Sequence, residues 1–460
     1  MALITRERDR VVGLVPDTLM AKLRAALSSD SDRSLARRVA STAFLIRVVA
    51  AALAFISQVM LARWMGTHEF GVFVYVMTWV MLFGALVDVG LASSTQRFIP
   101  HYSEKGAWSD LRGFLAASRW LTFWSAMLFS AIGMLVLYAL DGWIDHNTII
   151  PLYIGCVILP VYGVMHVQDG IARSYNWPNL ALLPPYVIRQ LLMIGLMGAA
   201  YALGMATDAT TGMVVAAVSI WVCAIGQYMM LTRKLSTEVP TGPKSYDLAH
   251  WLAVSIPMFL VDSLYMSLMY VDVLILKQFQ PADEIAIYYA AAKTLALVSF
   301  VYFAVSAASA HKFSEYYAAG DRDKLAAFTR DSVRWTFWPS LAAVLVILAV
   351  GWPLLRLFGP QFVAGYPLMF VLSIGVLARA AVGPGERFLS MLGQQKLCAV
   401  TALAALVTNV VLCLVLIPTY GIMGAAVAMS TAFIVESVAI FWIGRSKLGF
   451  HLFVFGGTKA

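Results

Sequence analysis

Apolar residues occur along this chain in stretches of about twenty, separated by short segments rich in charged residues, Gly and Pro. About twenty consecutive apolar residues are what an α-helix needs to cross the hydrocarbon core of a bilayer. Because backbone groups in that core must be hydrogen-bonded within their own segment, we expect helices there. The pattern predicts about twelve membrane-spanning helices, with approximate limits at residues 39–62, 70–93, 120–140, 148–167, 181–204, 213–232, 252–276, 286–310, 336–357, 368–389, 398–417 and 422–444.

The overall composition fits a chain whose main solvent is lipid. Hydrophobic residues make up 61% of the 460 residues and charged residues only 13%, whereas soluble domains hold about 45–50% apolar and ~25% charged residues. No Gly-x-x-x-x-Gly-Lys-Ser/Thr loop is present, so we expect neither ATP hydrolysis nor a cofactor. We also expect neither a disulfide framework nor a zinc site, because the cysteines lie singly in apolar stretches: Cys156, Cys223, Cys398 and Cys413.

Lys and Arg are distributed unevenly along the chain, and this distribution predicts its orientation. The net charge is +8, which alone would suit nucleic acid. With the N-terminus inside, the predicted inner segments hold 25 of the 33 Lys and Arg residues and the outer loops only three. Cytoplasmic loops of membrane proteins carry such an excess. We therefore predict cytoplasmic termini and no nucleic-acid partner. The short outer loops leave no room for a catalytic domain.

The second half of the sequence resembles the first at an offset of about 215 residues. Glu69–Tyr75 resembles Glu284–Tyr289, and Arg119-Trp120 is echoed by Arg334-Trp335. Apolar helices resemble each other by chance, but these matches lie at helix ends and loops. Six predicted spans separate each pair, so both halves have the same topology. Such a parallel repeat predicts two six-helix lobes with a cavity between them.

Polar segments divide the chain into five parts. Between the two halves lie Pro240, Gly242 and Pro243, which are typical of a linker. Near the N-terminus, Pro16–Ser28 is either a short amphipathic helix on the inner leaflet or a disordered tail. We expect a cytoplasmic N-terminal segment (1–38), a six-helix lobe (39–232), a cytoplasmic linker (233–250), a second six-helix lobe (251–444) and a cytoplasmic tail (445–460).

Short patterns in both halves resemble those of one transporter family. They are Arg38–Arg47, Ala62–Gly71, Val87–Leu91, Tyr270–Lys293 and Gly383–Lys396. No single pattern is specific, but their order along nearly the whole chain resembles the polysaccharide transporters of the multidrug/oligosaccharidyl-lipid/polysaccharide exporter superfamily. Exporters of murein precursors in that superfamily usually carry more spans than this chain, so the span count favours the polysaccharide branch.

The resemblance implies an all-α integral membrane protein with about twelve transmembrane helices in two six-helix lobes around a central cavity. It implies translocation of undecaprenyl-diphosphate-linked oligosaccharide repeat units across the bacterial inner membrane, for O-antigen, capsule or exopolysaccharide. The expected partners are this lipid-linked oligosaccharide, the lipid bilayer and polysaccharide polymerase or assembly proteins. A flippase of this kind is a transporter and not an enzyme.

Charged residues inside predicted spans are the candidates for the substrate path, since an unpaired charge at the bilayer centre costs at least ~2.5–3.5 kcal/mol on insertion scales. Arg47 lies in the first span, and Asp262 occupies the equivalent position of the seventh. We predict that the two residues are near neighbours in at least one state. Arg47 either binds the diphosphate, whose oxygens suit its planar guanidinium, or holds the lobes together in a permanent ion pair.

Further charges lie on other spans. Asp272 and Lys293 are predicted at similar depth on consecutive spans, where they neutralise each other. Arg379, near the middle of the tenth span, has no obvious local partner and is a second candidate for the anionic headgroup. Asp88 lies in the inner part of the second span, where a substrate would enter. Aromatic rings stack on sugars but more often fill helix contacts, and packing is the favoured role of the tyrosines in spans seven and eight: Tyr265, Tyr270, Tyr288, Tyr289 and Tyr302.

Three other classes of protein compete with the exporter interpretation. A multidrug or small-cation antiporter of the same superfamily would favour an acidic cavity, whereas Arg47, Lys293 and Arg379 favour an anionic ligand. A polymerase or ligase acting on the same lipid would need a large outer loop. A scaffold without transport activity would not need charges within its spans. The energy source stays open between the membrane potential, a proton carried by a carboxylate such as Asp262, and removal of product.

Overall fold

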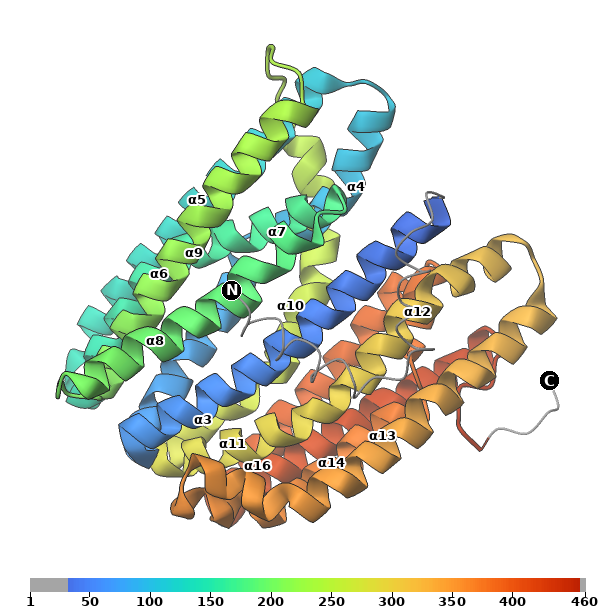
Figure 1. Ribbon diagram of the computed structural model, residues 1–460. Coiled ribbons are helices and arrows are strands. Elements are labelled where there is room, and N and C mark those ends of the chain that lie inside the picture. The colour runs from blue at the N-terminus through green and yellow to red at the C-terminus, as the bar shows by residue number, and fades with distance from the viewer. Residues whose placement is uncertain (1–31, 456–460) are drawn as a thin grey trace, which may run out of the picture.

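The computed structural model describes residues 32–455, and within this range every regular element is a helix (Figure 1). The Pro16–Ser28 segment lies outside the described residues, as do residues 456–460 of the expected tail. The N-terminal half comprises α3 (Asp32–Leu86), α4 (Leu91–Glu104), α5 (Trp108–Ala139), α6 (His146–Ser174), α7 (Pro178–Leu182), η3 (Leu183–Ile188), α8 (Arg189–Ala202) and α9 (Ala209–Glu238). The C-terminal half comprises α10 (Leu248–Phe279), α11 (Ala282–Leu295), η4 (Ala296–Val298), α12 (Ser299–Ala318), α13 (Arg322–Phe358), η5 (Pro360–Gly365), α14 (Tyr366–Ala381), α15 (Gly385–Met391) and α16 (Gln395–Lys447).

Within the described range, ten helical segments are long and apolar enough to cross a membrane. Two of them contain a sharp turn, because the backbone leaves helical geometry at Gly66 in α3 and at Gly421 in α16, with φ of 77° and 57°. Residues with a Cβ rarely adopt a positive φ, so both turns favour glycine. Each turn falls between two predicted spans. The total of about twelve spans stays a prediction.

The two halves contact each other at one end of the molecule, and their ribbons diverge toward the other end (Figure 1). At the contact end, α11 packs along α3. Gly71 lies so close to Ala282 that a Cβ on Gly71 would come 1.8 Å from the Ala282 carbonyl oxygen. The ring centroids of Phe70 and Phe362 lie 6.1 Å apart in the same region. The contact end carries the predicted outer loops, so the halves diverge toward the predicted cytoplasmic side.

Helix α10 contacts both halves. Its first turns pack on the N-terminal half, where the Trp251 indole N–H donates a 2.9 Å hydrogen bond to the Tyr102 hydroxyl. One turn later, the Ser255 hydroxyl donates to the Ser94 hydroxyl at 2.9 Å. Farther along, α10 packs against α16, and Leu268 is fully buried there. The start of α10, directly after the predicted linker, therefore still packs on the N-terminal half.

The second and eighth predicted spans are each interrupted, although their apolar patterns predict continuous helices. In the N-terminal half, α3 ends at Leu86, and a turn with a left-handed Gly90 (φ 77°) leads into α4. A Cβ on Gly90 would lie 2.4 Å from the Ser255 carbonyl oxygen, so the close approach of α10 also requires glycine there. In the C-terminal half, the short 3₁₀ segment η4 separates α11 from α12. These breaks fix the positions of the polar groups beside them.

Candidate functional site

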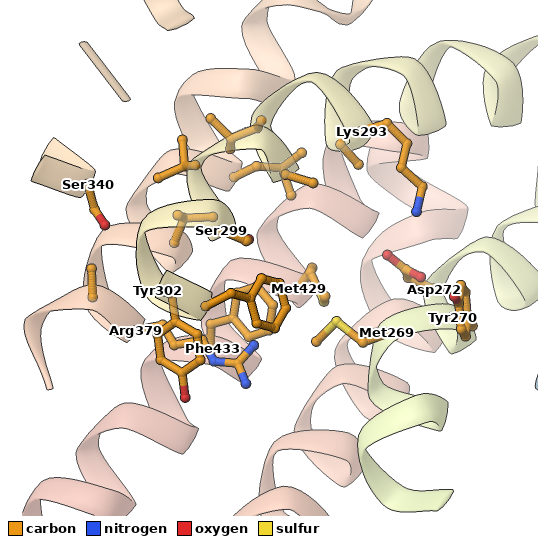
Figure 2. Close-up of a pocket in the computed structure, with 18 of the residues that line it drawn as sticks. Met269, Tyr270, Asp272, Lys293, Ser299, Tyr302, Ser340, Arg379, Met429 and Phe433 are labelled. Carbon is orange, nitrogen blue, oxygen red and sulfur yellow. The ribbon is translucent and has the colours of Figure 1, made fainter. Parts of the chain in front are cut away.

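The C-terminal half contains a cavity of about 320 Å³ between α10, α11, α12, α14 and α16 (Figure 2). Its volume lies within the ~300–1,000 Å³ range of small-molecule sites. The basic side chains on its wall are Lys293, Arg379 and Arg387, and the acidic ones are Asp272 and Glu386. The structure thus gathers charges from four helices of one half around a single cavity.

Arg379 is held between two carboxylates and two aromatic rings. Its Nη2 lies 3.5 Å from Glu386 Oε2, and its Nε lies 3.6 Å from Glu436 Oε2. Its guanidinium carbon is 5.3 Å from the ring centroids of both Tyr302 and Phe433, within the range of cation–π interactions (Figure 2). The expectation that Arg379 has no local partner is therefore wrong. Glu386 follows in the same predicted span, whereas Tyr302 on α12 and the Glu436 and Phe433 side chains on α16 come from helices that the sequence does not place beside α14.

Glu436 is fully buried. Within the described part of the chain, neither of its carboxylate oxygens has a hydrogen-bond donor, so Arg379 supplies its counter-charge. A buried carboxylate is tolerated when an opposite charge compensates it. Glu436 was not among the site residues predicted from the sequence. The signal that could have indicated it is an acidic residue inside a long apolar stretch.

Asp272 and Lys293 both lie on the cavity wall, at the end away from Arg379 (Figure 2). The Lys293 side chain points toward the Asp272 carboxylate, but the direct partner of Asp272 is Tyr288, whose hydroxyl donates a short hydrogen bond to Oδ2. The Val273 backbone N–H donates to Oδ1 at 2.8 Å. The Lys293 ammonium also lies 5.0 Å from the centroid of the Tyr289 ring. Within residues 32–455, Lys293 acts on Asp272 as a nearby charge without a direct ion pair, so its ammonium keeps donors for another anion.

Arg47 and Asp262 do not pair in this conformation. The Asp262 carboxylate accepts a 2.5 Å hydrogen bond from the Ser93 hydroxyl, across the contact between α10 and α4. The charges that act on Arg47 come from Asp169 and Arg173 in α6, which form their own ion pair at 2.7 Å. Arg47 itself is exposed on the first part of α3. The predicted meeting of Arg47 and Asp262 concerns another state of the protein and stays a prediction.

Asp88 is placed by the break between α3 and α4. It is buried, and its Oδ1 accepts a 2.8 Å hydrogen bond from the Gly90 backbone N–H, which closes the turn. Its Oδ2 lies 3.0 Å from Nδ1 of His166 in α6. Ser93, which donates a hydrogen bond to Asp262, lies in the first turn of α4. Both partners of Asp88 thus belong to the N-terminal half, and Asp88 does not line the cavity of the C-terminal half.

Four of the five tyrosines in the seventh and eighth predicted spans line the cavity: Tyr270, Tyr288, Tyr289 and Tyr302. Tyr288 is fully buried, as the packing role predicts, whereas the other three are partly exposed. The fifth, Tyr265, lies off the cavity wall, and its hydroxyl has no hydrogen-bond partner among the described residues.

A second cavity, of about 420 Å³, lies in the N-terminal half between α3, α5 and α6. Charged side chains are missing from its described wall, which consists of aliphatic and aromatic groups apart from the Tyr75 hydroxyl and Cys156. The rings of Trp79 and Phe83 stack at 5.1 Å along this wall. The chemistry of this cavity suits hydrocarbon and contrasts with the charged cavity of the other half.

Comparisons with families place this sequence among transport proteins. A family model described as polysaccharide biosynthesis protein matches residues 37–311, which is more than half of the chain. A second family model, MatE, matches residues 257–415. A comparison with proteins of curated function finds no match.

Solved structures of transporters share the fold. A multidrug resistance MATE family transporter of the MOP superfamily, in an inward-facing conformation, superposes with a TM-score of 0.70 at 16% identity, over 88% of this chain and 94% of that one. The lipid II flippase MurJ, in an inward closed conformation, gives 0.70 at 15% identity over 87% of both chains. A MOP superfamily transporter from Pyrococcus furiosus, whose binding pocket has reverse polarity, gives 0.65 at 16% identity over 92% and 97%. Together they confirm the predicted all-helical transporter fold.

Proposed function

This chain belongs to the polysaccharide biosynthesis protein family, and from that membership we propose that it moves a polyprenyl-diphosphate-linked oligosaccharide across the bacterial inner membrane. It is a multi-pass membrane transporter and not an enzyme. The lipid II flippase MurJ, with the same fold, supports a lipid-linked substrate. Such a substrate joins an anionic diphosphate to a sugar chain and a hydrocarbon chain, so its path has to accommodate three chemistries.

The observation that carries the proposal is the cavity wall of the C-terminal half. The wall carries three basic side chains, Lys293, Arg379 and Arg387, and only two acidic ones. Tyrosines such as Tyr270 and Tyr302 supply ring faces. Guanidinium and ammonium groups bind phosphate oxygens. Tyrosine presents an apolar ring with a polar hydroxyl, which suits a sugar. The diphosphate is therefore assigned to the basic groups and the first sugars to the tyrosines.

The arrangement of the halves suggests how the substrate enters. The ribbons diverge toward the side where the predicted topology places the cytoplasm (Figure 1). Arg47 is exposed and not bonded to Asp262 in this conformation, so its guanidinium is available to an entering anion. In the proposed cycle the two lobes, residues 39–232 and 251–444, then part at their present contact and release the substrate outside. Arg47 and Asp262 meet in the state that follows.

Reconstituted protein provides the test. Purified full-length protein in vesicles should move a labelled polyprenyl-diphosphate oligosaccharide between leaflets, and Lys293→Ala should slow this movement roughly tenfold, because hydrogen bonds to charged groups contribute about 1.5–3 kcal/mol. The matched control is Lys244→Ala, since Lys244 is exposed in the linker. Equal rates for both variants would exclude the cavity from the path, and no movement by the wild type would overturn the function.

A multidrug or cation antiporter is the second candidate function. The MatE match and the carboxylates Asp272, Glu386 and Glu436 near the cavity favour it. This candidate predicts that vesicles containing the protein take up or expel a lipophilic cation such as ethidium against a proton or sodium gradient. It also predicts that neutral substitutions of the carboxylates stop that movement. The exporter interpretation predicts no ethidium movement.

A further inference from the structure

Two carboxylates share the single guanidinium of Arg379, and they differ in access to the cavity. The side chain of Glu386 is 33% exposed and lines the cavity, whereas that of Glu436 is fully buried. Glu386 lies in the first turn of the short helix α15, directly after the left-handed Gly383 (φ 58°). Glu436 lies inside the long helix α16. The two acids have the same charge and the same partner, but only one of them can move into the cavity.

We propose that Glu386 is a resident competitor of the anionic group of the substrate. Glu386 occupies one edge of the Arg379 guanidinium until a diphosphate displaces it, while Glu436 stays in place and holds the guanidinium. This inference rests on the proposed function, because it takes a diphosphate as the ligand of the cavity. It makes Glu386 a residue that determines specificity.

The geometry of Arg379 supports an exchange of anions on one edge. Glu386 approaches Nη2 and Glu436 approaches Nε, at 3.5 and 3.6 Å. Strong charge-assisted hydrogen bonds are shorter, about 2.7–2.9 Å. Both contacts are therefore loose. Burial keeps Glu436 in place, whereas Glu386 on the cavity wall can give way to an anion with two well-placed oxygens. The rings of Tyr302 and Phe433 flank the guanidinium and fix its orientation, so displacement of Glu386 leaves Arg379 where it is (Figure 2).

The charge balance favours exchange over simple addition of a third anion. Arg379 and its two carboxylates carry a formal net charge of −1. A diphosphate added to this set would place three anionic groups around one cation, which is costly where water is scarce. Tyr265 and Tyr302 also face the cluster, as neutral hydroxyls, and the cation Arg387 lies on the same cavity wall. Moving Glu386 aside removes the nearest repulsion and frees an edge of the guanidinium.

A resident competitor has two consequences for transport. A substrate anion displaces Glu386 only when it binds Arg379 more tightly than Glu386 does. A single phosphate with one suitable contact therefore gains less binding free energy than a diphosphate. After the substrate has crossed, the returning Glu386 carboxylate assists its release. Neutralising Glu386 should therefore tighten binding and slow turnover, whereas a purely structural residue would weaken binding when it is changed.

Binding of inorganic pyrophosphate to the purified full-length protein tests the proposal by titration calorimetry. We expect Glu386→Gln to bind pyrophosphate roughly tenfold more tightly than the wild type, a factor within the range of energetic coupling between sites. Glu436→Gln is the matched control, because it removes the same charge at nearly the same distance from Arg379. If general electrostatics alone were at work, both variants would gain equally. In the exchange model, Glu386→Gln gains clearly more.

Flipping kinetics give a second readout. In vesicles, Glu386→Gln should lower both KM and kcat for the lipid-linked oligosaccharide. Equal pyrophosphate affinities for Glu386→Gln and Glu436→Gln, or no pyrophosphate binding by any of the proteins, would overturn the competitor role, while movement of the lipid-linked substrate by the wild type would still support the proposed function. If Glu386→Gln does not fold, Glu386→Asp, which withdraws the carboxylate by one methylene, should raise the affinity by a smaller factor. An unchanged or lower affinity of Glu386→Asp would count against the proposal.

Discussion

The N-terminal and C-terminal halves, which the sequence predicts to be repeats, hold different chemistry at equivalent positions. With the offset of 215 residues between Glu69 and Glu284, Asp272 and Lys293 on the cavity wall correspond to Ser57 and Thr78. Ser57 and Thr78 are buried and uncharged. Equivalent positions of the predicted repeat therefore carry a carboxylate and an ammonium in one half and two hydroxyls in the other.

The two cavities show the same difference. The cavity of the C-terminal half has charged groups and tyrosines on its wall, whereas that of the N-terminal half is lined by hydrocarbon. Arg379 itself corresponds to Val164. The comparison indicates that equivalent positions of the predicted repeat stay within helices while the charge of the interior diverges. An asymmetric substrate with a charged and an apolar part fits such a protein.

The largest effect is expected from Arg379→Met, which makes position 379 uncharged like the equivalent Val164. Glu436 then loses its counter-charge while fully buried, so we expect the free energy of unfolding to fall by about 3–5 kcal/mol. Chemical denaturation in detergent micelles measures this change. Val164→Met is the matched control and should cost less than about 1.5 kcal/mol. The double substitution Arg379→Met/Glu436→Met should recover most of the loss. A loss in the single variant no larger than that of the control would show that Glu436 is not charged.

A smaller effect is expected when Tyr288 is made to resemble its N-terminal counterpart, Phe73. Tyr288→Phe removes the hydroxyl that donates to the buried Asp272 carboxylate. An unsatisfied buried acceptor costs about 1–3 kcal/mol, which the same denaturation assay would detect. Tyr289→Phe serves as control, because Tyr289 has no side-chain hydrogen bond to Asp272. A neutral outcome for Tyr288→Phe would mean that Lys293 moves in as a substitute donor.

Lys293→Thr copies Thr78 into the C-terminal half and should separate binding from stability. Loss of one phosphate-binding cation should raise the KM for the lipid-linked oligosaccharide roughly tenfold. The free energy of unfolding should change by less than about 1 kcal/mol, because the ammonium faces the cavity. Vesicle flipping at several substrate concentrations, beside a denaturation curve, measures both quantities. An unchanged KM would remove Lys293 from the binding site.

The smallest effect is expected on the uncharged side of the comparison, from Ser57→Ala. The Ser57 hydroxyl is buried and has no hydrogen-bond partner within the described chain. Its removal leaves no partner unsatisfied, so stability and flipping rate should stay within about 0.5 kcal/mol of the wild type. Differential scanning measurements and the vesicle assay are sensitive enough to test this. A clear loss of transport would show that the substrate touches the N-terminal half at this depth.

Much of the fold follows from the sequence because the bilayer imposes it. Helix length and apolar content are set by membrane thickness, and turns such as those at Gly66 and Gly421 need residues that tolerate positive φ. The predicted all-helical fold and the family are therefore confirmed. The placement of Asp272 and Lys293 on one wall also follows from their similar depth on consecutive spans.

The contacts within the candidate site depend on which faces of distant helices meet. An apolar sequence carries little information about those faces. Arg379 and Glu436 lie on different helices of similar composition, and nothing in either segment indicates their rotation about the helix axis. The break at Asp88 is similar, because an apolar stretch around Gly90 predicts a continuous span. The close approach of α10 explains why the turn needs glycine.

Helix α10 sets a condition on the order in which the protein assembles. Its first turns are bonded to Tyr102 and Ser94 in helices that are made early, whereas its later part is covered by α16, the last helix to be made. Insertion of α10 can therefore begin against the helices of the N-terminal half, but Leu268 is covered only after α16 has been made. Pro257 lies between the two regions and removes one backbone hydrogen bond. A nascent chain that ends before α16 thus carries an α10 whose later part is still uncovered.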